Sequence, residues 1–110
     1  MFEGYGVFFW DTGKRYEGHW KSGLFDGVGK LTYNNGDIYQ GDYVRGKREG
    51  TGSFSSLKDK MEYKGSWKRG LQHGQGLLMV ERNGAVPVRF KKGILEVFLS
   101  SSADPINNKL

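Results

Sequence analysis

Aromatic residues and glycines alternate with polar residues along this chain at short, regular intervals. From Tyr16 to Ile38 an aromatic residue stands at places 1 and 5, and glycine stands at places 3, 8, 12 and 14. The same frame begins again at Tyr39 and at Tyr63, so the starts lie 23 and then 24 residues apart. Self-similarity at a fixed short period is typical of a repeat architecture. Within each unit the residues change character with the strand period of two, which predicts β-structure.

Each unit is predicted to form one β-hairpin. The segments 16–20 and 30–33 are the expected strands, the segment 23–27 is the expected tight connection, and Asn34-Asn35-Gly36-Asp37 has the residues of a turn. A helix is disfavoured, because each interior glycine costs about 1 kcal/mol relative to alanine. Consecutive hairpins joined by short turns therefore predict an all-β fold, an elongated, twisted, single-layer antiparallel sheet.

The frame also predicts the division of the chain. A repeat domain is expected over residues 1–99, with a partial unit, three full units and a degenerate unit, and a polar tail follows at 100–110. The units are 1–15, 16–38, 39–62, 63–85 and 86–99. The first unit enters the frame at its second half, which is compatible with the loss of upstream units and equally with a natural half-unit. The segment Ile94–Leu99 is expected to close the end of the sheet.

One face of the predicted sheet carries the aromatic side chains. A glycine has no Cβ, so it leaves a flat place on which the ring of a neighbouring strand can lie. These rings must build the sheet. A single layer would also leave them uncovered, and exposed aromatic rows are typical of interfaces. We therefore expect this face to serve both packing and partner binding. The predicted anchors are Tyr16, Trp20, Tyr33, Tyr39, Tyr43, Phe54, Tyr63 and Trp67.

Basic residues recur at places 6 and 7 of successive units. The net charge of +5 and the pI of about 9.5 favour anionic partners without choosing among them. Strand spacing puts these residues about 10 Å apart along one edge. They are either a solvated edge that prevents edge pairing or a strip for an acidic peptide or anionic lipid. The predicted rim residues are Lys21, Arg45, Lys68 and Arg69, continued by Lys91 and Lys92.

Enzymatic activity, cofactor binding and metal binding are not expected. The chain has no cysteine, and its two histidines, His19 and His73, lie at different places in the frame. Carboxylates are spread singly, with no pair repeated as a site, as at Glu17, Asp26, Asp42 and Glu49. We find no secretory signal and no apolar stretch of the ~18–20 residues that a membrane span needs.

The frame Y-x-G-x-W-x-x-G-x-x-x-G-x-G resembles the MORN repeat over roughly residues 2 to 93. The segment GLFDGVGKLTYNNGDIYQGDY and the degenerate last unit are similar to small stand-alone members of the retinophilin type. The resemblance implies a non-enzymatic module whose aromatic groove binds a helical or extended segment of a partner protein, such as the tail of a cytoskeletal motor. It also implies a cytoplasmic location, at the cytoskeleton or the membrane periphery.

The same residues allow three other interpretations. The first is a peripheral membrane adaptor that binds anionic phospholipid through the basic edge. The second is a homodimer that pairs through exposed end strands and the apolar ends of the sheet. The third, nucleic-acid binding, is disfavoured because the rings are interleaved with structural glycines on the same face.

Overall fold

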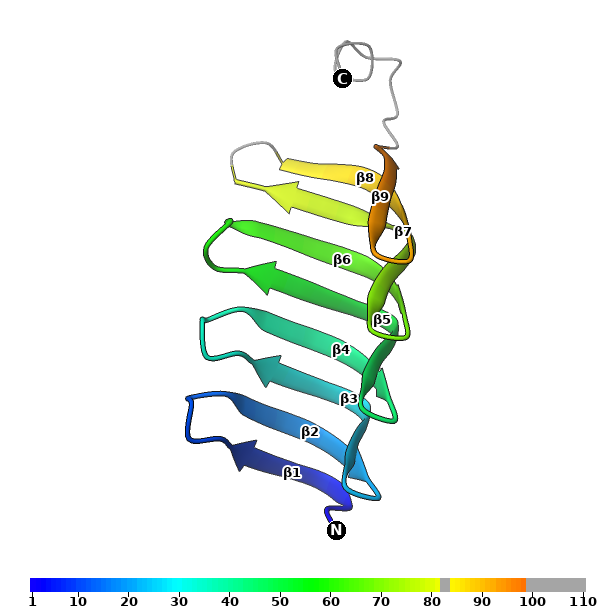
Figure 1. Cartoon of the computed structure of the whole chain (residues 1–110). Helices are drawn as coiled ribbons and strands as arrows, with labels where there is room; N and C mark the ends of the chain where they lie inside the picture. Colours follow the sequence, from blue (N-terminus) through cyan, green and yellow to red (C-terminus); the bar gives the residue numbers. More distant parts are fainter. Residues whose placement is uncertain (82–83, 99–110) are drawn as a thin grey trace.

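The computed structural model describes residues 1–81 and 84–98, which form one open antiparallel sheet of nine strands in sequence order. The strands are β1 (Gly4–Phe9), β2 (Arg15–Lys21), β3 (Leu24–Thr32), β4 (Ile38–Val44), β5 (Lys47–Ser56), β6 (Met61–Lys68), β7 (Leu71–Val80), β8 (Gly84–Lys91) and β9 (Ile94–Phe98). The molecule measures 53 × 23 × 17 Å, and the strands follow one another along its long axis (Figure 1). The predicted fold class is confirmed.

The hairpins follow the sequence frame. In β2–β3, β4–β5 and β6–β7 the glycines at places 3 and 14 stand directly opposite each other, as Gly18 and Gly29 do in the first of these hairpins. β1 pairs with β2 as the second strand of a unit would, with Gly6 opposite Gly18. β9 pairs with β8 at the far edge, as expected for the segment that begins at Ile94.

The tight turns are shorter than the sequence predicted. The expected connection over 23–27 is in fact the two-residue turn Ser22–Gly23, and β3 already begins at Leu24. Ser22 and Gly23 have φ of +52° and +80°, as in the type I′ turns that match the twist of a hairpin. The turns Arg45–Gly46, Arg69–Gly70 and Lys92–Gly93 have the same conformation.

A bulge interrupts each hairpin between its tight turn and its central glycine pair. In β2–β3 the three residues 26–28 of β3 stand opposite His19 alone. Gly27, in the middle of these residues, has a φ of +102°. A bulge of this kind bends the strand and increases its twist. Figure 1 shows the strands turning sharply as they approach the tight turns.

The bend creates a core within a single layer. Aromatic rings on the two sides of the bend pack against one another rather than facing solvent. The buried apolar side chains are Tyr16, Trp20, Leu31, Tyr39, Tyr43, Tyr63, Trp67, Val88 and Phe90. The predicted tail at 100–110 lies outside the described residues.

Candidate functional site

The tyrosine at place 1 lies over the glycines of its own hairpin. A Cβ built on Gly29 would stand 2.0 Å from Tyr16 Oη, and one built on Gly52 would stand 2.3 Å from Tyr39 Oη. The tyrosine hydroxyl donates to the backbone carbonyl at place 4: Tyr16 to His19 O and Tyr39 to Asp42 O, both at 2.9 Å. Ring and glycine thus fix each other's position.

The residue at place 5 links each unit to the one before it. Trp67 Nε1 donates to Gly52 O at 2.9 Å, and Trp20 Nε1 donates to Gly6 O at 3.2 Å. Tyr43 takes this place in the middle unit, and its buried hydroxyl finds no hydrogen-bond partner among the described residues. The carbonyl of the place-14 glycine therefore accepts a hydrogen bond from the next unit wherever that unit has tryptophan at place 5.

Burial raises the pKa of the four core tyrosines. With the nearby Asp26 carboxylate, burial raises the pKa of Tyr16 to about 12. For Tyr39, burial and the Asp42 carboxylate raise the pKa, and for Tyr43 and Tyr63 burial is the main cause of the rise. The sheet therefore depends on keeping these hydroxyls neutral.

Alkaline pH is expected to unfold the protein. A tyrosine with a pKa of 10.0 when unfolded and about 12 when folded ionises more readily in the unfolded chain. The stability that Tyr16 contributes is therefore complete below pH 10 and falls as the pH rises toward 12. We expect tyrosinate absorbance and loss of the β-sheet circular dichroism signal to rise together in this range. Tyr16→Phe should keep its β-sheet circular dichroism signal to a higher pH than the control Asp11→Asn does. If the two variants unfold at the same alkaline pH, ionisation of Tyr16 does not drive the unfolding.

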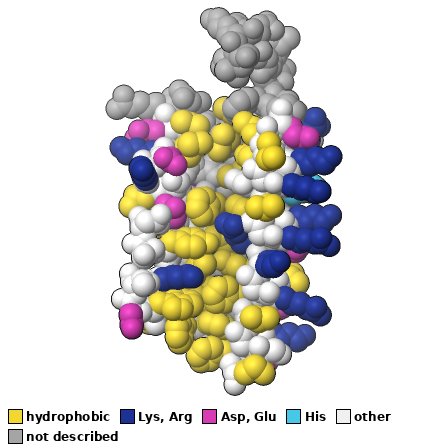
Figure 2. All heavy atoms as spheres, in the orientation of Figure 1, with side chains coloured by type: hydrophobic (Ala, Val, Ile, Leu, Met, Phe, Trp, Pro, Cys, Tyr) yellow, Lys and Arg dark blue, Asp and Glu magenta, His cyan; other side chains and the backbone are white. Residues whose placement is uncertain are grey.

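Half-buried apolar side chains line the same face beside the core. These residues form what we call the apolar stripe: Phe8, Trp10, Phe25, Tyr33, Phe54, Leu78 and Val86. Figure 2 shows hydrophobic side chains running along the length of this face. Two cations lie on its rings. Lys14 Nζ is 4.9 Å from the centre of the Trp10 ring, and the Arg48 guanidinium is 5.9 Å from the centre of the Phe54 ring.

The eight predicted anchors divide into two groups. The structure buries six of them, at 7% exposure or less. Those six are Tyr16, Trp20, Tyr39, Tyr43, Tyr63 and Trp67. Tyr33 and Phe54 remain half-buried on the apolar stripe. The expectation that a single layer leaves the whole aromatic row uncovered is wrong, because the bend at each bulge packs the rings together.

The predicted rim residues lie together at the tight turns. Lys21, Arg45, Lys68 and Arg69 are all exposed, as are Lys91 and Lys92. Figure 2 shows Lys and Arg side chains gathered along this long border of the molecule. Arg45, Arg69 and Lys92 are the first residues of the type I′ turns, where the left-handed backbone directs them outward.

A ladder of hydrogen bonds, which the repeat frame did not predict, joins each tight turn to the preceding unit. Gly46 N donates to Phe25 O at 2.7 Å, and Arg45 N donates to Asp26 Oδ2 at 3.1 Å. Each other tight turn repeats both bonds, with Glu3, Glu49 and His73 as the side-chain acceptors. Those acceptors all occupy place 11, so Asp26 and Glu49 stand singly, one to a unit, but at equivalent positions that support the next turn. The sequence signal for the ladder is the recurrence of an acceptor side chain at place 11.

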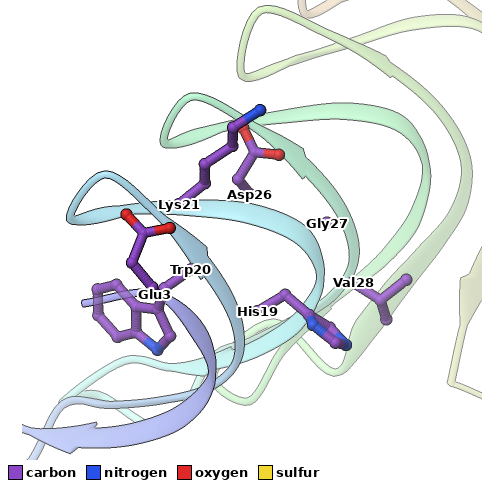
Figure 3. A pocket seen from close by; sticks show the side chains of 7 residues that line it. All are labelled: Glu3, His19, Trp20, Lys21, Asp26, Gly27 and Val28. Atoms are coloured by element: carbon purple, nitrogen blue, oxygen red, sulfur yellow. The ribbon is translucent and has the colours of Figure 1, made fainter.

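The pocket in Figure 3 lies beside this ladder rather than on the apolar stripe. It has a volume of about 500 Å³ and is lined by Glu3, His19, Trp20, Lys21, Asp26, Gly27 and Val28. Glu3 Oε2 accepts from Ser22 N at 2.6 Å, and Asp26 accepts from Arg45 N. Both carboxylates therefore support turns, and His19 projects away from them at the other end of the pocket (Figure 3).

Residues 1–81 and 84–98 contain no group of three or more His, Cys, Asp or Glu side chains placed to hold a metal ion. Among the same residues there is no helix with the length and apolar character needed to cross a membrane.

Comparisons with known proteins agree with the repeat frame. The family model described as MORN repeat matches residues 1–15, 16–38, 39–56 and 63–79, which is more than half of the chain. The first two matches coincide with the units that the frame predicts. A comparison with curated proteins found no match.

Proposed function

Because this chain belongs to the MORN repeat family, we propose that it is a non-enzymatic interaction module that binds a segment of a partner protein along its apolar stripe. MORN repeats are a non-catalytic repeat type associated with protein or membrane-lipid interactions. The observation that carries the proposal is the apolar stripe itself, which stays half-buried while the core rings beneath it are covered. Its Tyr33 and Phe54 are the predicted anchors still accessible to a partner.

The proposed partner is cytoskeletal or membrane-associated. This part of the proposal rests on the similarity of the layout to small stand-alone MORN proteins of the retinophilin type, whose implied partner is the tail of a cytoskeletal motor. The exposed basic rim beside the stripe supports an acidic partner, because complementary charge steers association and sets specificity.

Phe54→Glu is expected to abolish partner binding, because it puts a charge on the apolar stripe. Ser53→Glu is the matched control: it adds the same charge on the neighbouring residue, whose side chain points to the opposite face. Affinity capture from cell extract, quantified by mass spectrometry, should enrich the same proteins with the wild type and Ser53→Glu and lose them with Phe54→Glu. Both variants must first show the wild-type circular dichroism spectrum. Equal capture by both variants would contradict binding along the stripe.

A second candidate function is the binding of anionic phospholipid by the basic rim. The observation in its favour is the alignment of exposed cations at successive tight turns (Figure 2). Each basic residue close to an anionic membrane contributes about 1 kcal/mol, so several together would hold the sheet at the surface.

Co-sedimentation with phosphatidylserine vesicles tests the lipid candidate. We expect binding at low salt that the double substitution Lys68→Ala/Arg69→Ala weakens about thirtyfold, in line with about 1 kcal/mol per basic residue. Lys30→Ala/Lys64→Ala removes the same charge from the opposite face and should have a smaller effect. If binding disappears at physiological salt, where exposed charges are screened beyond about 8 Å, the lipid candidate is excluded.

A further inference from the structure

Arg48 stands on the apolar stripe where the preceding units have phenylalanine. Place 10 is occupied by Phe2 in the half-unit, by Phe25 in the next unit and by Arg48 in the one after. Each packs on the place-5 ring of the following unit. The ring centres of Phe2 and Trp20 are 4.8 Å apart, those of Phe25 and Tyr43 are 5.2 Å apart, and the Arg48 guanidinium lies 4.6 Å from the Trp67 ring centre. Arg48 thus occupies the same position against the place-5 ring as these phenylalanines and adds a charge.

The guanidinium of Arg48 retains donors for a ligand. It carries five N–H groups, and Nη2 donates to Gly70 O at 2.5 Å. The ion pairs among the described residues join Arg15 to Glu17, Lys60 to Glu81 and Arg89 to Glu96, so none of them involves Arg48. Arg48 is half-buried between the rings of Tyr39, Phe54 and Trp67. Around it water is partly excluded, which strengthens a charge-assisted bond.

A carboxylate fits this position better than a neutral group does. The guanidinium of arginine presents paired N–H groups that match the two oxygens of a carboxylate. Packing against aromatic rings restricts the orientation of the guanidinium. The exposed rim next to the stripe is also cationic, at Lys21, Arg45, Lys68 and Arg69. The electrostatic potential of the rim therefore attracts a negatively charged partner as well.

We propose that Arg48 is the carboxylate-binding position of the apolar stripe, and that the partner is a protein segment with an Asp or Glu flanked by apolar residues. This inference rests on the proposed function, since it names the partner chemistry of the same site. Two strands separate Phe25 from Arg48 in successive units, which is about 10 Å along the stripe. An apolar residue of the segment over Phe25 therefore lies about seven residues from the acid if the segment is helical, or about three if it is extended.

A random peptide library displayed on phage and selected on the immobilised full chain tests this. The wild type should enrich peptides with an acid among apolar residues at one of those two spacings. Arg48→Phe restores the residue of the earlier units, so it should fold and should lose the acid preference. Arg45→Ser is the control: it removes one charge on the rim and takes the residue found at Ser22 in the equivalent turn position.

The best selected peptide and its acid-to-amide version are then titrated by fluorescence anisotropy. At physiological salt we expect Arg48→Phe to lower the affinity for the acidic peptide about tenfold. Arg45→Ser should lower this affinity much less. The amide version should bind the wild type and Arg48→Phe equally. Acid enrichment that persists on Arg48→Phe would overturn the inference, as would equal losses in the two variants. Apolar peptides without an acid would leave the proposed function standing and reject the inference, and the absence of any stripe-binding peptide would reject both.

Discussion

Replacing Tyr39 with alanine is expected to lower the free energy of unfolding by about 3–5 kcal/mol, the usual cost of truncating a buried aromatic residue. Tyr39 is fully buried, at 0% exposure, in the middle of the sheet. Its ring packs edge-on against Tyr43 and Trp67 at 5.1 and 5.2 Å between ring centres, so it joins two units. A loss of this size is a large part of the total stability of a domain this small.

Chemical denaturation followed by circular dichroism measures this effect. Tyr39→Phe keeps the ring and loses only the hydroxyl bond to Asp42 O, so it should cost about 1 kcal/mol. Tyr5→Ala removes a ring that is 66% exposed on the edge strand, and its effect should stay near 0.5 kcal/mol. If Tyr39→Ala is no more destabilising than Tyr5→Ala, the ring does not hold the sheet together.

Gly29→Ala is expected to destabilise the protein by about 1–3 kcal/mol or more, the cost of overpacking. The new Cβ would stand 2.0 Å from Tyr16 Oη and 2.4 Å from its Cζ, and a ring that is itself fully buried has no room to withdraw. The ring would have to leave its site, and the bond from Tyr16 to His19 O would be lost with it.

Gly6→Ala is the matched control, because Gly6 holds the same place in the half-unit. The described structure has no place-1 tyrosine over Gly6, and a Cβ there would come no closer than 3.5 Å, to Trp20 Nε1. We expect this change to be neutral, or to stabilise by about 0.4–1 kcal/mol through the lower entropy of the unfolded chain. Equal destabilisation by the two substitutions would show that the place-1 ring is not the reason for glycine at place 14.

The main features of the fold were predictable from the sequence because they depend on short-range pattern. The recurring aromatic and glycine places predicted hairpins, and hairpins in series leave a single antiparallel sheet as the simplest arrangement. The opposed pairs such as Gly41 and Gly52 confirm that the repeat frame is also the register of the sheet. The polar turn at Asn34–Asp37 likewise falls between β3 and β4.

The burial of the rings could not be predicted in this way. Strand parity put Trp20 and Tyr43 on the correct face, but it treated that face as flat. The bulge at residues 26–28 bends the hairpin, and a bulge adds residues to one strand without a distinct side-chain signature beyond its glycine. The candidate site therefore shifted from the core tyrosines to the half-buried stripe, where only Tyr33 and Phe54 of the predicted anchors remain accessible.

By itself the sequence determined the repeat, the strand order, the face on which the aromatic residues lie and the basic row, because each depends on residues near one another in the chain. Only the tertiary structure decided which rings are core, how Asp26 supports the next unit's turn, and that Arg48 packs on Trp67. These contacts join residues about 19 positions or more apart. Their geometry follows from the bend of the sheet, which brings place 10 of one unit against place 5 of the next.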